Sequence, residues 1–423
     1  MTTKVIHRDD CRLCGSSKVE VVVHLEPVPL AEKYTATPEP AKQAEKFPID
    51  LYFCHSCAHV QILDIISSDT LWDDYTYHSG QTRGIVDHFK EEAQEIISQY
   101  DPPSGSLVID VGSNDGSLLR PFKEAGYSVL GIDPAKEIAE KATASGIPTI
   151  ADFMTHEVGK KILREYGPAK VVTAFNVFAH AADMTGMAQA IRLLLDKDGV
   201  FVFEVQYLMD IVEKNLLGTI FHEHMSHHSL KPMMMFLERH DMELIDVKRV
   251  SIQKGSIIGF AKVKGGKRPV KASVNQLISL EAEKGLHSFQ TIKTFESKLM
   301  RIRADVQKHI LEWKSQNYVI AAFGAARSGP TFIAQFGLES AIEYIFDDHP
   351  QKVGKYSPPS GVKVFPTTEL YTKNPKIIVI LAWIHAKKIV SSNQKFLDQG
   401  GKFVVLCPDF QIIDNNSSYS NLL

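Results

Sequence analysis

The sequence of 423 residues has few cysteines, almost no net charge and no long apolar run. Five cysteines are too few for a disulfide-stabilised secreted scaffold, and MTTKVIHRDD has no apolar signal-peptide core, so we expect a cytoplasmic protein. The 47 basic and 50 acidic residues give a net charge of −3, which leaves at most a local patch for nucleic acid or anionic lipid. The strongest apolar run, IIVILAWI at 377–384, has the length of a buried strand, far below the roughly 18 residues of a spanning helix. We therefore predict no nucleic-acid partner and no membrane partner.

Length and composition indicate a globular protein of two or three domains. Hydrophobic residues make up 44% and charged residues 23% of the chain, close to the globular average, and a domain takes roughly 150 residues. Residues 1–65 show little helical periodicity. From residue 107, apolar runs alternate with helical stretches, which predicts a parallel sheet with covered faces. A linker, GGKRP, follows Val263; residues 272–315 favour one long helix or a helical pair, and a second α/β pattern begins at residue 318.

Four of the five cysteines form two CxxC pairs near the start of the chain. Cys11 and Cys14 are followed, after 39 intervening residues, by Cys54 and Cys57. This spacing places both sulfurs of each turn on one tetrahedral metal, and four thiolates favour zinc in a closed structural site. Two unrelated pairs or a redox motif are the alternatives, although redox chemistry would need a single pair. Cys407 lies in the apolar run FVVLC, and we expect it to be buried in packing.

A glycine-rich turn follows the first strand of the α/β pattern, in VIDVGSNDGSLL at residues 108–119. The pattern predicts a strand over 108–111, a turn over 112–116 and a helix that begins near Ser117. Gly112 and Gly116 would let a nucleotide-type ligand approach the backbone, and Asn114 tolerates the left-handed conformation. The next strand ends in Asp133, where a carboxylate can accept both hydroxyls of a ribose. A Rossmann-like layer that binds no ligand is the alternative.

These motifs resemble the class I S-adenosylmethionine-dependent methyltransferases. An acidic residue ends the second strand, ADF at 151–153 follows the third strand, and FNVFAH at 175–180 ends the fourth. The resemblance implies S-adenosylmethionine as a cofactor. It implies that this methyl donor is bound by Asp110, Gly112, Asn114, Asp115, Gly116, Asp133, Asp152, Phe153 and Asn176.

Four histidines and a glutamate lie close together in FHEHMSHHS at residues 221–229. They could be metal ligands, although HExxH is absent, or structural residues, or one imidazole could be a general base, since histidine titrates near neutral pH. Adjacent residues on a strand point to opposite sides, so Glu223 need not contact His224. Upstream, LWDDYTYHSG places Tyr75 and Tyr77 at alternating positions, either as one face of packing or as hydroxyls in a cleft.

Along residues 8–410 the chain resembles the sugar C-methyltransferases. The shared features are the paired CxxC motifs, YxYxSG, VIDVGSNDG, NVFAH, the HEH segment and GAxxxGxT, which opens the second α/β pattern. The resemblance implies an α/β protein with a small zinc-binding module over 1–70, a class I methyltransferase Rossmann-like domain over 71–265, and a second Rossmann-like α/β domain, preceded by a long helical segment, over 266–423. We expect a monomer or a small homo-oligomer.

The same resemblance implies a reaction and its residues. The family methylates the carbon beside the ketone, C3, of a nucleotide-linked 4-keto-deoxysugar, typically a dTDP-sugar, through an enolate that a base generates. The base of the family corresponds to His224, with Glu223 beside it; either Tyr75 or Tyr77, and also His180, would lie near the sugar. Residues expected to bind the substrate are Phe221, His222, Gly324, Arg327 and Asp347.

Two positions depart from the family pattern. Phe221 stands where members often have tyrosine, and Arg327 stands where they usually have lysine; arginine keeps the charge and adds forked donors for a pyrophosphate. Pro330 replaces the lysine of a phosphate loop, so we do not expect ATP hydrolysis. Asp347 lies 23 residues after Gly324, where a nucleotide ribose binds in a Rossmann unit. An O- or N-methyltransferase, or a zinc-ribbon scaffold with a degenerate methyltransferase fold, are the alternatives.

Overall fold

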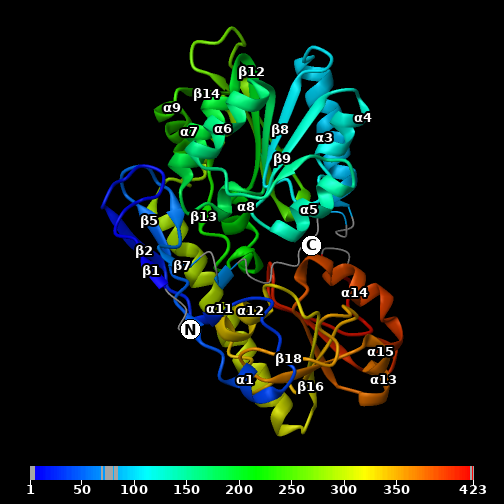
Figure 1. The fold of residues 1–423 in the computed structure, drawn as a ribbon. Coiled ribbons are helices and arrows are strands. Elements are labelled where there is room, and N and C mark those ends of the chain that lie inside the picture. The colour runs from blue at the N-terminus through cyan, green and yellow to red at the C-terminus, as the bar shows by residue number, and fades with distance from the viewer. Residues whose placement is uncertain (1–4, 68–69, 72–79, 81–83, 420–421, 423) are drawn as a thin grey trace. The chain divides into compact units, whose positions relative to one another are not determined.

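The computed structural model describes residues 5–67, 70–71, 80, 84–419 and 422 (Figure 1). Packing divides the chain into two compact units. The first unit contains Met1–Glu20, Phe53–Met209 and Met225–Ser288, and the second contains Val21–Tyr52, Asp210–His224 and Phe289–Leu423. The three domains bounded at residues 70 and 265 stay a prediction. Among the described residues, no helix is long and apolar enough to cross a membrane.

A seven-stranded sheet forms the centre of the first unit. Its strand order is β10-β9-β8-β11-β12-β15-β14, and all strands run parallel except β15, which is antiparallel to both neighbours. The sequence pattern predicted a parallel sheet; β15 differs because only a short turn joins it to β14, which forces an antiparallel pair. The order reverses between β8 and β11, and such a switch point is where open α/β sheets bind ligands. The strands are β8 (Leu107–Val111), β9 (Ser128–Ile132), β10 (Thr149–Ile150), β11 (Ala169–Phe175), β12 (Leu195–Gln206), β14 (Met242–Val250) and β15 (Ser256–Val263).

Helices cover both faces of this sheet. α3 buries Ile85, Phe89 and Ala93 at helical spacing, and it packs with α4 against the face that carries Val108 of β8. On the opposite face, Phe236 of α9 packs on Phe178. The helices are α3 (Ile85–Tyr100), α4 (Leu119–Glu124), α5 (Lys136–Ala144), α6 (His156–Tyr166), α7 (Met184–Leu194), α9 (Leu230–Arg239) and α10 (Ala272–Glu283). The predicted class I methyltransferase fold is confirmed, with the predicted strands and helices in place.

Short strands make up most of the regular structure of residues 5–66, which include the cysteine pairs, and β13 joins them. They form a four-stranded sheet with the order β13-β6-β5-β2 and two small two-stranded sheets, β1-β7 and β3-β4. In the first unit, β13 pairs antiparallel with β6, with Ser226 opposite Gln61. The elements are β1 (Val5–His7), β2 (Val19–Val23), β3 (Val28–Pro29), α1 (Pro38–Lys42), β4 (Lys46–Phe47), β5 (Leu51–Cys54), β6 (Val60–Gln61), β7 (Asp64–Ile66) and β13 (Ser226–His227). A module with so little regular structure agrees with the predicted zinc-binding region.

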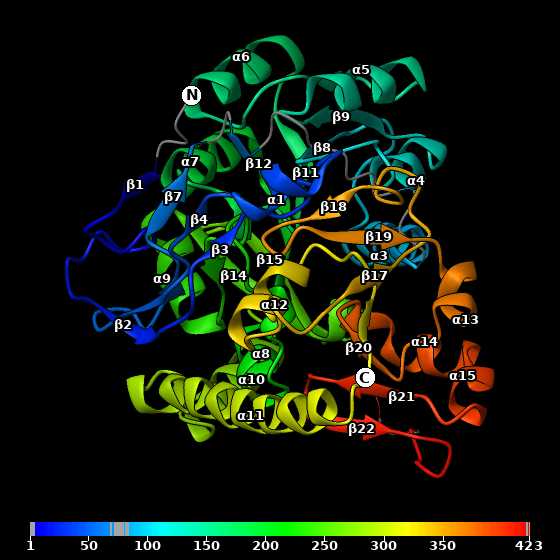
Figure 2. The same cartoon turned by 90° about the horizontal axis from the view of Figure 1, so that it is seen from below.

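The second unit is built on another seven-stranded sheet, with the order β18-β19-β17-β16-β20-β21-β22 (Figure 2). The five central strands are parallel, and the edge strands β18 and β22 are antiparallel to their neighbours. Here the order reverses between β16 and β20. The strands are β16 (Ile320–Phe323), β17 (Tyr344–Phe346), β18 (Tyr356–Ser357), β19 (Val362–Phe365), β20 (Ile377–Ile380), β21 (Lys402–Val405) and β22 (Gln411–Ile413). The predicted second Rossmann-like domain is therefore present.

The helical stretch over 272–315 is a pair of helices. α10 ends just before Gly285, whose φ of +65° lies in the left-handed region, and α11 (Phe289–Ser315) follows. α11 buries residues from Ile292 to Trp313 at intervals of three and four, which gives one apolar face over its whole length. The other helices are α8 (Leu208–Glu213), α12 (Gly329–Gln335), α13 (Leu370–Lys373), α14 (Ala386–Ser392) and α15 (Gln394–Asp398).

Candidate active site

The four paired cysteines meet at one point. Their sulfur atoms all lie within 4.8 Å of one another, with Cys11 Sγ 3.7 Å from Cys57 Sγ and Cys14 Sγ 3.5 Å from Cys54 Sγ. Zinc–thiolate bonds of about 2.3 Å in a tetrahedron require sulfur separations of about 3.8 Å, so the four residues fit a zinc ion. Burial raises the pKa of Cys54 to about 11, so a thiolate at this position needs a nearby cation.

Arg12, inside the first CxxC pair, holds a backbone segment of the same unit. Its guanidinium is buried and donates to the carbonyl of Met225 at 2.6 Å and to the carbonyl of Ile62 at 3.0 Å. The Ile62 amide donates to the same Met225 carbonyl at 2.9 Å. The cysteine module therefore fixes the backbone at the residue that follows His224 in the chain.

A turn at the carboxyl end of β8 carries the first group of predicted donor-binding residues. Gly112 and Asn114 have φ values of +70° and +49°. A Cβ on Gly112 would lie 2.4 Å from Cγ2 of Val177, which follows β11 across the switch point. Asp133, after β9, accepts from the backbone amides of Asn114 and Ala135, both at 2.9 Å. Burial raises the pKa of Asp133. Each oxygen keeps a second lone pair, so the carboxylate can still accept the hydroxyls of a ribose.

Asp110 and Asp115 shape this turn from within. Asp110 is buried, accepts from the Thr173 hydroxyl at 2.6 Å, and so ties β8 to β11. Burial raises the pKa of Asp110 to about 7. Asp115 accepts from the Ser117 hydroxyl at 2.6 Å and from the Gly80 amide at 2.7 Å. Gly116 has a φ of +77°, and a Cβ there would lie 2.8 Å from Ile147, so only glycine fits.

Three further predicted donor-binding residues follow β10 and β11. Asp152 accepts from the amide of Phe153, and the Phe153 side chain is 46% exposed. An exposed aromatic ring beyond the carboxyl end of a strand suits stacking on a planar base. Asn176, directly after β11, has a φ of +58°. The glycine cradle, the Asp133 carboxylate and the exposed ring together fit S-adenosylmethionine.

In the second unit, a hydrogen bond to the backbone fixes the tautomer of His224. Its Nδ1 lies 2.7 Å from the carbonyl oxygen of Thr219, which can only accept, so Nδ1 carries the proton and Nε2 carries the lone pair. Phe221 packs against the imidazole, with 3.9 Å between ring centroids. Burial lowers the pKa of His224 to about 4, in spite of the hydrogen bond to Thr219, and the positive charge of Arg327 lowers it further. The imidazole is therefore neutral at pH 7, as a general base must be.

Glu223 forms an ion pair with Arg327. Nη1 of Arg327 donates to Oε2 of Glu223, and the side chains are 23% and 9% exposed, respectively. Burial raises the pKa of Glu223, and the charge of Arg327 opposes that rise. The carboxylate thus neutralises the arginine, and the tautomer of His224 is set by a backbone carbonyl.

The turn after β16 repeats the geometry of the turn after β8. Gly324 has a φ of +96°, and a Cβ there would lie 2.3 Å from Cβ of Ala382, across the switch point. Asp347, after β17, accepts from the amides of Ala325 at 2.6 Å and His349 at 2.7 Å, just as Asp133 accepts from two amides in the first unit. The second unit therefore has, at its own switch point, the turn geometry at which open α/β sheets bind ligands.

Comparison with known proteins matches all three parts of the chain. Family models match residues 11–72 as a zinc binding domain, residues 86–247 as a methyltransferase domain and residues 251–408 as a C-methyltransferase C-terminal domain. The C-methyltransferase NovU of Streptomyces niveus is 30% identical over 411 residues, covering 97% of this chain and 98% of the relative. The chain belongs to the C-methyltransferase family. It is an S-adenosylmethionine-dependent methyltransferase with a zinc-binding domain.

Solved structures similar to this C-methyltransferase add no functional information. The magnesium protoporphyrin IX methyltransferase of Synechocystis PCC 6803, with bound SAH, is 17% identical and covers 45% of this chain and 90% of its own, with a TM-score of 0.35. The CcbJ methyltransferase of Streptomyces caelestis is 12% identical and covers 46% of this chain and 96% of its own, with a TM-score of 0.34. Similarity at this level supports no conclusion about the substrate.

Some of the residues predicted for catalysis and substrate binding contact one another in the structure of the C-methyltransferase, and others have different surroundings. Within the second unit, Glu223 meets Arg327, and Phe221 meets His224. His222 is buried, with its ring edge-on to Phe47. His180 closes the 3-10 turn Phe178–His180 after β11. Tyr75 and Tyr77 lie outside the described residues.

Two features that support the predicted residues of the C-methyltransferase could not be found from the sequence. The Thr219 carbonyl sets the tautomer of His224, and a backbone carbonyl is invisible to any residue pattern. Lys352 bonds the Ala325 carbonyl at 2.8 Å and pairs with Glu32 at 2.7 Å, which supports the turn after β16. No motif joins Glu32 to Lys352, so only their proximity in the fold identifies the pair.

Proposed function

We propose that this C-methyltransferase methylates C3 of a nucleotide-linked 4-keto-deoxysugar, most simply a dTDP-sugar, and that His224 is the base. The observation that carries the proposal is the state of His224: a neutral imidazole with its proton on Nδ1 and its lone pair on Nε2. Methylation at carbon requires removal of a C–H proton, and a ketone acidifies the neighbouring carbon enough for an imidazole to accept it.

We assign the steps of this reaction to different residues. S-adenosylmethionine supplies an electrophilic methyl group, and the Gly112 turn with Asp133 would hold it. His224 would take the C3 proton on Nε2, and the electron pair of the C–H bond would become the enolate. As the enolate carbon bonds to the methyl carbon, the bond from that methyl group to sulfur breaks, and its electron pair stays on the sulfur of the leaving S-adenosylhomocysteine. A positive charge stabilises an enolate oxygen, and Arg327 is the cation that acts on His224. Tyr75 or Tyr77 and His180 remain the proposed contacts of the sugar.

The second Rossmann-like unit supports a nucleotide as the carrier of the sugar. Gly324 and Asp347 repeat the arrangement of Gly112 and Asp133, which suits a ribose and a base rather than a free sugar. Arg327 is already paired with Glu223, so a pyrophosphate would bind there only in competition with that carboxylate. We therefore assign Asp347 to the nucleoside and Glu223, His224 and Arg327 to the sugar.

The experiment follows the proton and the methyl group separately. Purified protein is incubated with S-adenosylmethionine carrying an isotope-labelled methyl group and with dTDP-, UDP- and GDP-linked 4-keto-deoxysugars, and the products are analysed by NMR. We expect the label on C3 of the dTDP-sugar and, in deuterated water, exchange of the C3 proton. Label on oxygen or nitrogen, or transfer to none of these sugars, would contradict the proposal.

A pair of histidine variants tests the base. His224→Gln keeps a side-chain amide near Thr219 but loses the basic nitrogen, so we expect proton exchange and turnover to fall at least about a hundredfold. Calorimetry should show unchanged binding of S-adenosylmethionine. The matched control is His24→Gln, whose side chain is 67% exposed and which should behave as wild type. Near-normal exchange in His224→Gln would move the base elsewhere.

A further inference from the structure

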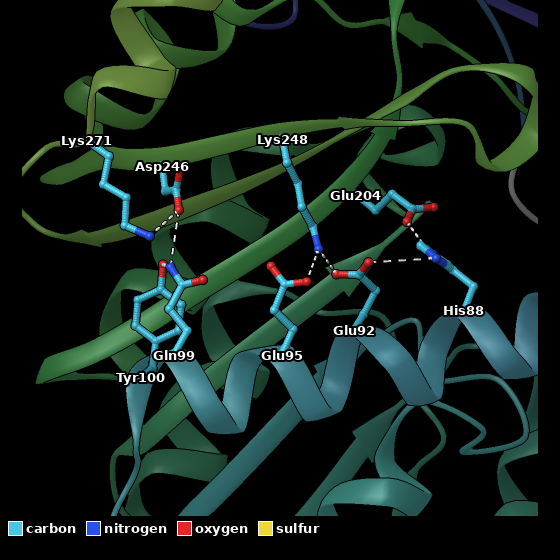
Figure 3. Close-up of polar contacts among 9 residues, drawn as sticks. All are labelled: His88, Glu92, Glu95, Gln99, Tyr100, Glu204, Asp246, Lys248 and Lys271. Carbon is cyan, nitrogen blue, oxygen red and sulfur yellow. Dashed lines mark hydrogen bonds and ion pairs between the residues drawn. The ribbon is translucent and has the colours of Figure 1, made fainter.

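Glu204, at the centre of the first unit, is a completely buried carboxylate whose oxygens both have partners. Oε1 accepts from Nδ2 of Asn176 at 2.8 Å. Figure 3 shows the other contact, in which Oε2 lies 2.5 Å from Nε2 of His88. The backbone carbonyl of Glu204 also accepts from the Asn176 amide at 2.8 Å. Neither Glu204 nor His88 belongs to any motif of the sequence. A buried carboxylate is costly unless it is paired, so this position requires an explanation.

Charged side chains from two elements, α3 and β14, support the pair. His88 and Glu92 lie on one face of α3, 3.8 Å apart, and Glu92 contacts Lys248 of β14 at 2.6 Å (Figure 3). Lys248 also contacts Glu95, on the next turn of α3, at 2.7 Å. Burial lowers the pKa of His88, but the hydrogen bond to Glu204 and its negative charge outweigh burial, and the net shift of the pKa is upward. His88 is thereby held against Glu204 as a hydrogen-bond donor.

This pairing fixes which way the Asn176 amide faces. A carboxylate can only accept hydrogen bonds, so the NH₂ group of Asn176 must face Glu204, and the side-chain oxygen is directed away from it. Asn176 directly follows β11 with a φ of +58°, a conformation that asparagine adopts only occasionally. The side chain of the next residue, Val177, packs against Gly112 of the turn after β8, because a Cβ on Gly112 would lie 2.4 Å from Cγ2 of Val177. The oxygen of Asn176 is therefore set beside the switch point where the donor binds.

We propose that Glu204 and His88 are positioning residues for methyl transfer: they hold Asn176 so that its side-chain oxygen accepts a hydrogen bond from a bound reactant. The partner has the chemistry of an O–H or N–H donor. Such a group is present on S-adenosylmethionine, as an ammonium or a ribose hydroxyl, and on a sugar, as a hydroxyl. The inference rests on the donor site of the first unit and holds whichever acceptor the enzyme uses.

Exchanging the acid and the amide tests this orientation. In Glu204→Gln, His88 donates to the new carbonyl oxygen, so the new NH₂ faces Asn176 and turns its amide over. In Asn176→Asp, two carboxylates face each other. The double variant Glu204→Gln/Asn176→Asp restores one amide facing one carboxylate and again directs an oxygen outward. We expect the affected constant, either the Kd for S-adenosylmethionine or the KM for the sugar, to rise about tenfold or more in each single variant. In the double variant, the same constant should return to within about threefold of the wild-type value.

Two measurements separate the reactants. The Kd for S-adenosylmethionine, from calorimetry, rises in the single variants if the donor is the partner; if the sugar is the partner, this Kd is unchanged and KM for the dTDP-4-keto sugar rises instead. Wild-type turnover of that sugar is measured first, so failure of the proposed substrate is recognised independently and leaves the calorimetric test in force. Thermal melting of each variant identifies those altered only in stability.

The control variant is Gln99→Leu, on the same face of α3, where Gln99 bonds Asp246 rather than Glu204 (Figure 3). It should leave Kd and KM unchanged. If Glu204→Gln fails to fold, His88→Gln, which keeps a donor for Glu204, and His88→Leu, which removes it, make the same comparison: only the second should weaken the affected constant. The inference is overturned if Glu204→Gln matches wild type in both constants, if the double variant is no better than the worse single variant, or if His88→Leu equals His88→Gln.

Discussion

Arg327→Met should destabilise the second unit strongly, because it leaves the buried carboxylate of Glu223 without its counter-ion. Removing one partner of a buried ion pair costs about 3–5 kcal/mol. Arg327 is 23% exposed and Glu223 is 9% exposed, and Lys33 also acts favourably on the carboxylate, so solvent and this second cation reduce the loss. We expect a decrease of about 2–3 kcal/mol in the free energy of unfolding.

Three companion variants isolate the ion pair. Arg327→Lys keeps the charge and should cost less than about 1 kcal/mol. Glu223→Gln leaves an arginine that can reach water, and it should cost about 1 kcal/mol. The double variant Arg327→Met/Glu223→Gln removes both charges and should be more stable than Arg327→Met alone by about 1 kcal/mol or more.

Urea unfolding followed by tryptophan fluorescence measures these changes, because Trp313 and Trp383 are buried in the second unit. The pH dependence is a further check. Burial already raises the pKa of Glu223, and loss of Arg327 raises it further, so the penalty is full above that pKa and fades as the pH falls through it and the carboxylate takes up a proton. The reasoning is refuted if, at about pH 8, Arg327→Met lies within about 0.5 kcal/mol of wild type, or if the double variant is no more stable than Arg327→Met.

Removing zinc with a chelator, or Cys54→Ser, should lower the melting temperature; at a free zinc concentration of about 1,000 times the Kd, binding stabilises the fold by about 4 kcal/mol, and an unchanged melting curve would argue against a structural metal. Gly112→Ala should abolish binding of S-adenosylmethionine in calorimetry, because its Cβ would meet Val177 at 2.4 Å, whereas Gly105→Ala, with a similar φ of +77° and open space around it, should cost only about 1 kcal/mol of stability. With S-adenosylmethionine saturating, so that titration of Asp110 in the donor site does not limit the rate, activity should be lost as the pH falls through about 4, where His224 is protonated; a limb near about 6.5 under these conditions would show that His224 is exposed to solvent or is not the base.

The cysteine cluster and the glycine turn proposed for the donor could be located from the sequence, because their residues are close together in the chain. Each CxxC pair forms within a single turn, and VIDVGSNDG is one strand followed by one turn. Local backbone geometry thus decides the positions of Cys11, Cys14, Gly112 and Asn114. The alternating strands and helices likewise indicated two Rossmann-like units, whereas the antiparallel β15 required knowledge of its pairing.

The sequence by itself determined the kinds of site to be expected, namely a zinc site from its four paired cysteines and, as predictions, a glycine turn for a methyl donor and a histidine that acts as a base. Only the tertiary structure decided which groups act together. Glu223 and Arg327 are 104 residues apart, and Asn176, directly after β11, and Glu204, in the neighbouring strand β12, are 28 residues apart. Such pairs have no sequence signature, because hydrogen bonds and ion pairs depend on distance in space, and the protonation state of His224 depends on burial and on one backbone carbonyl.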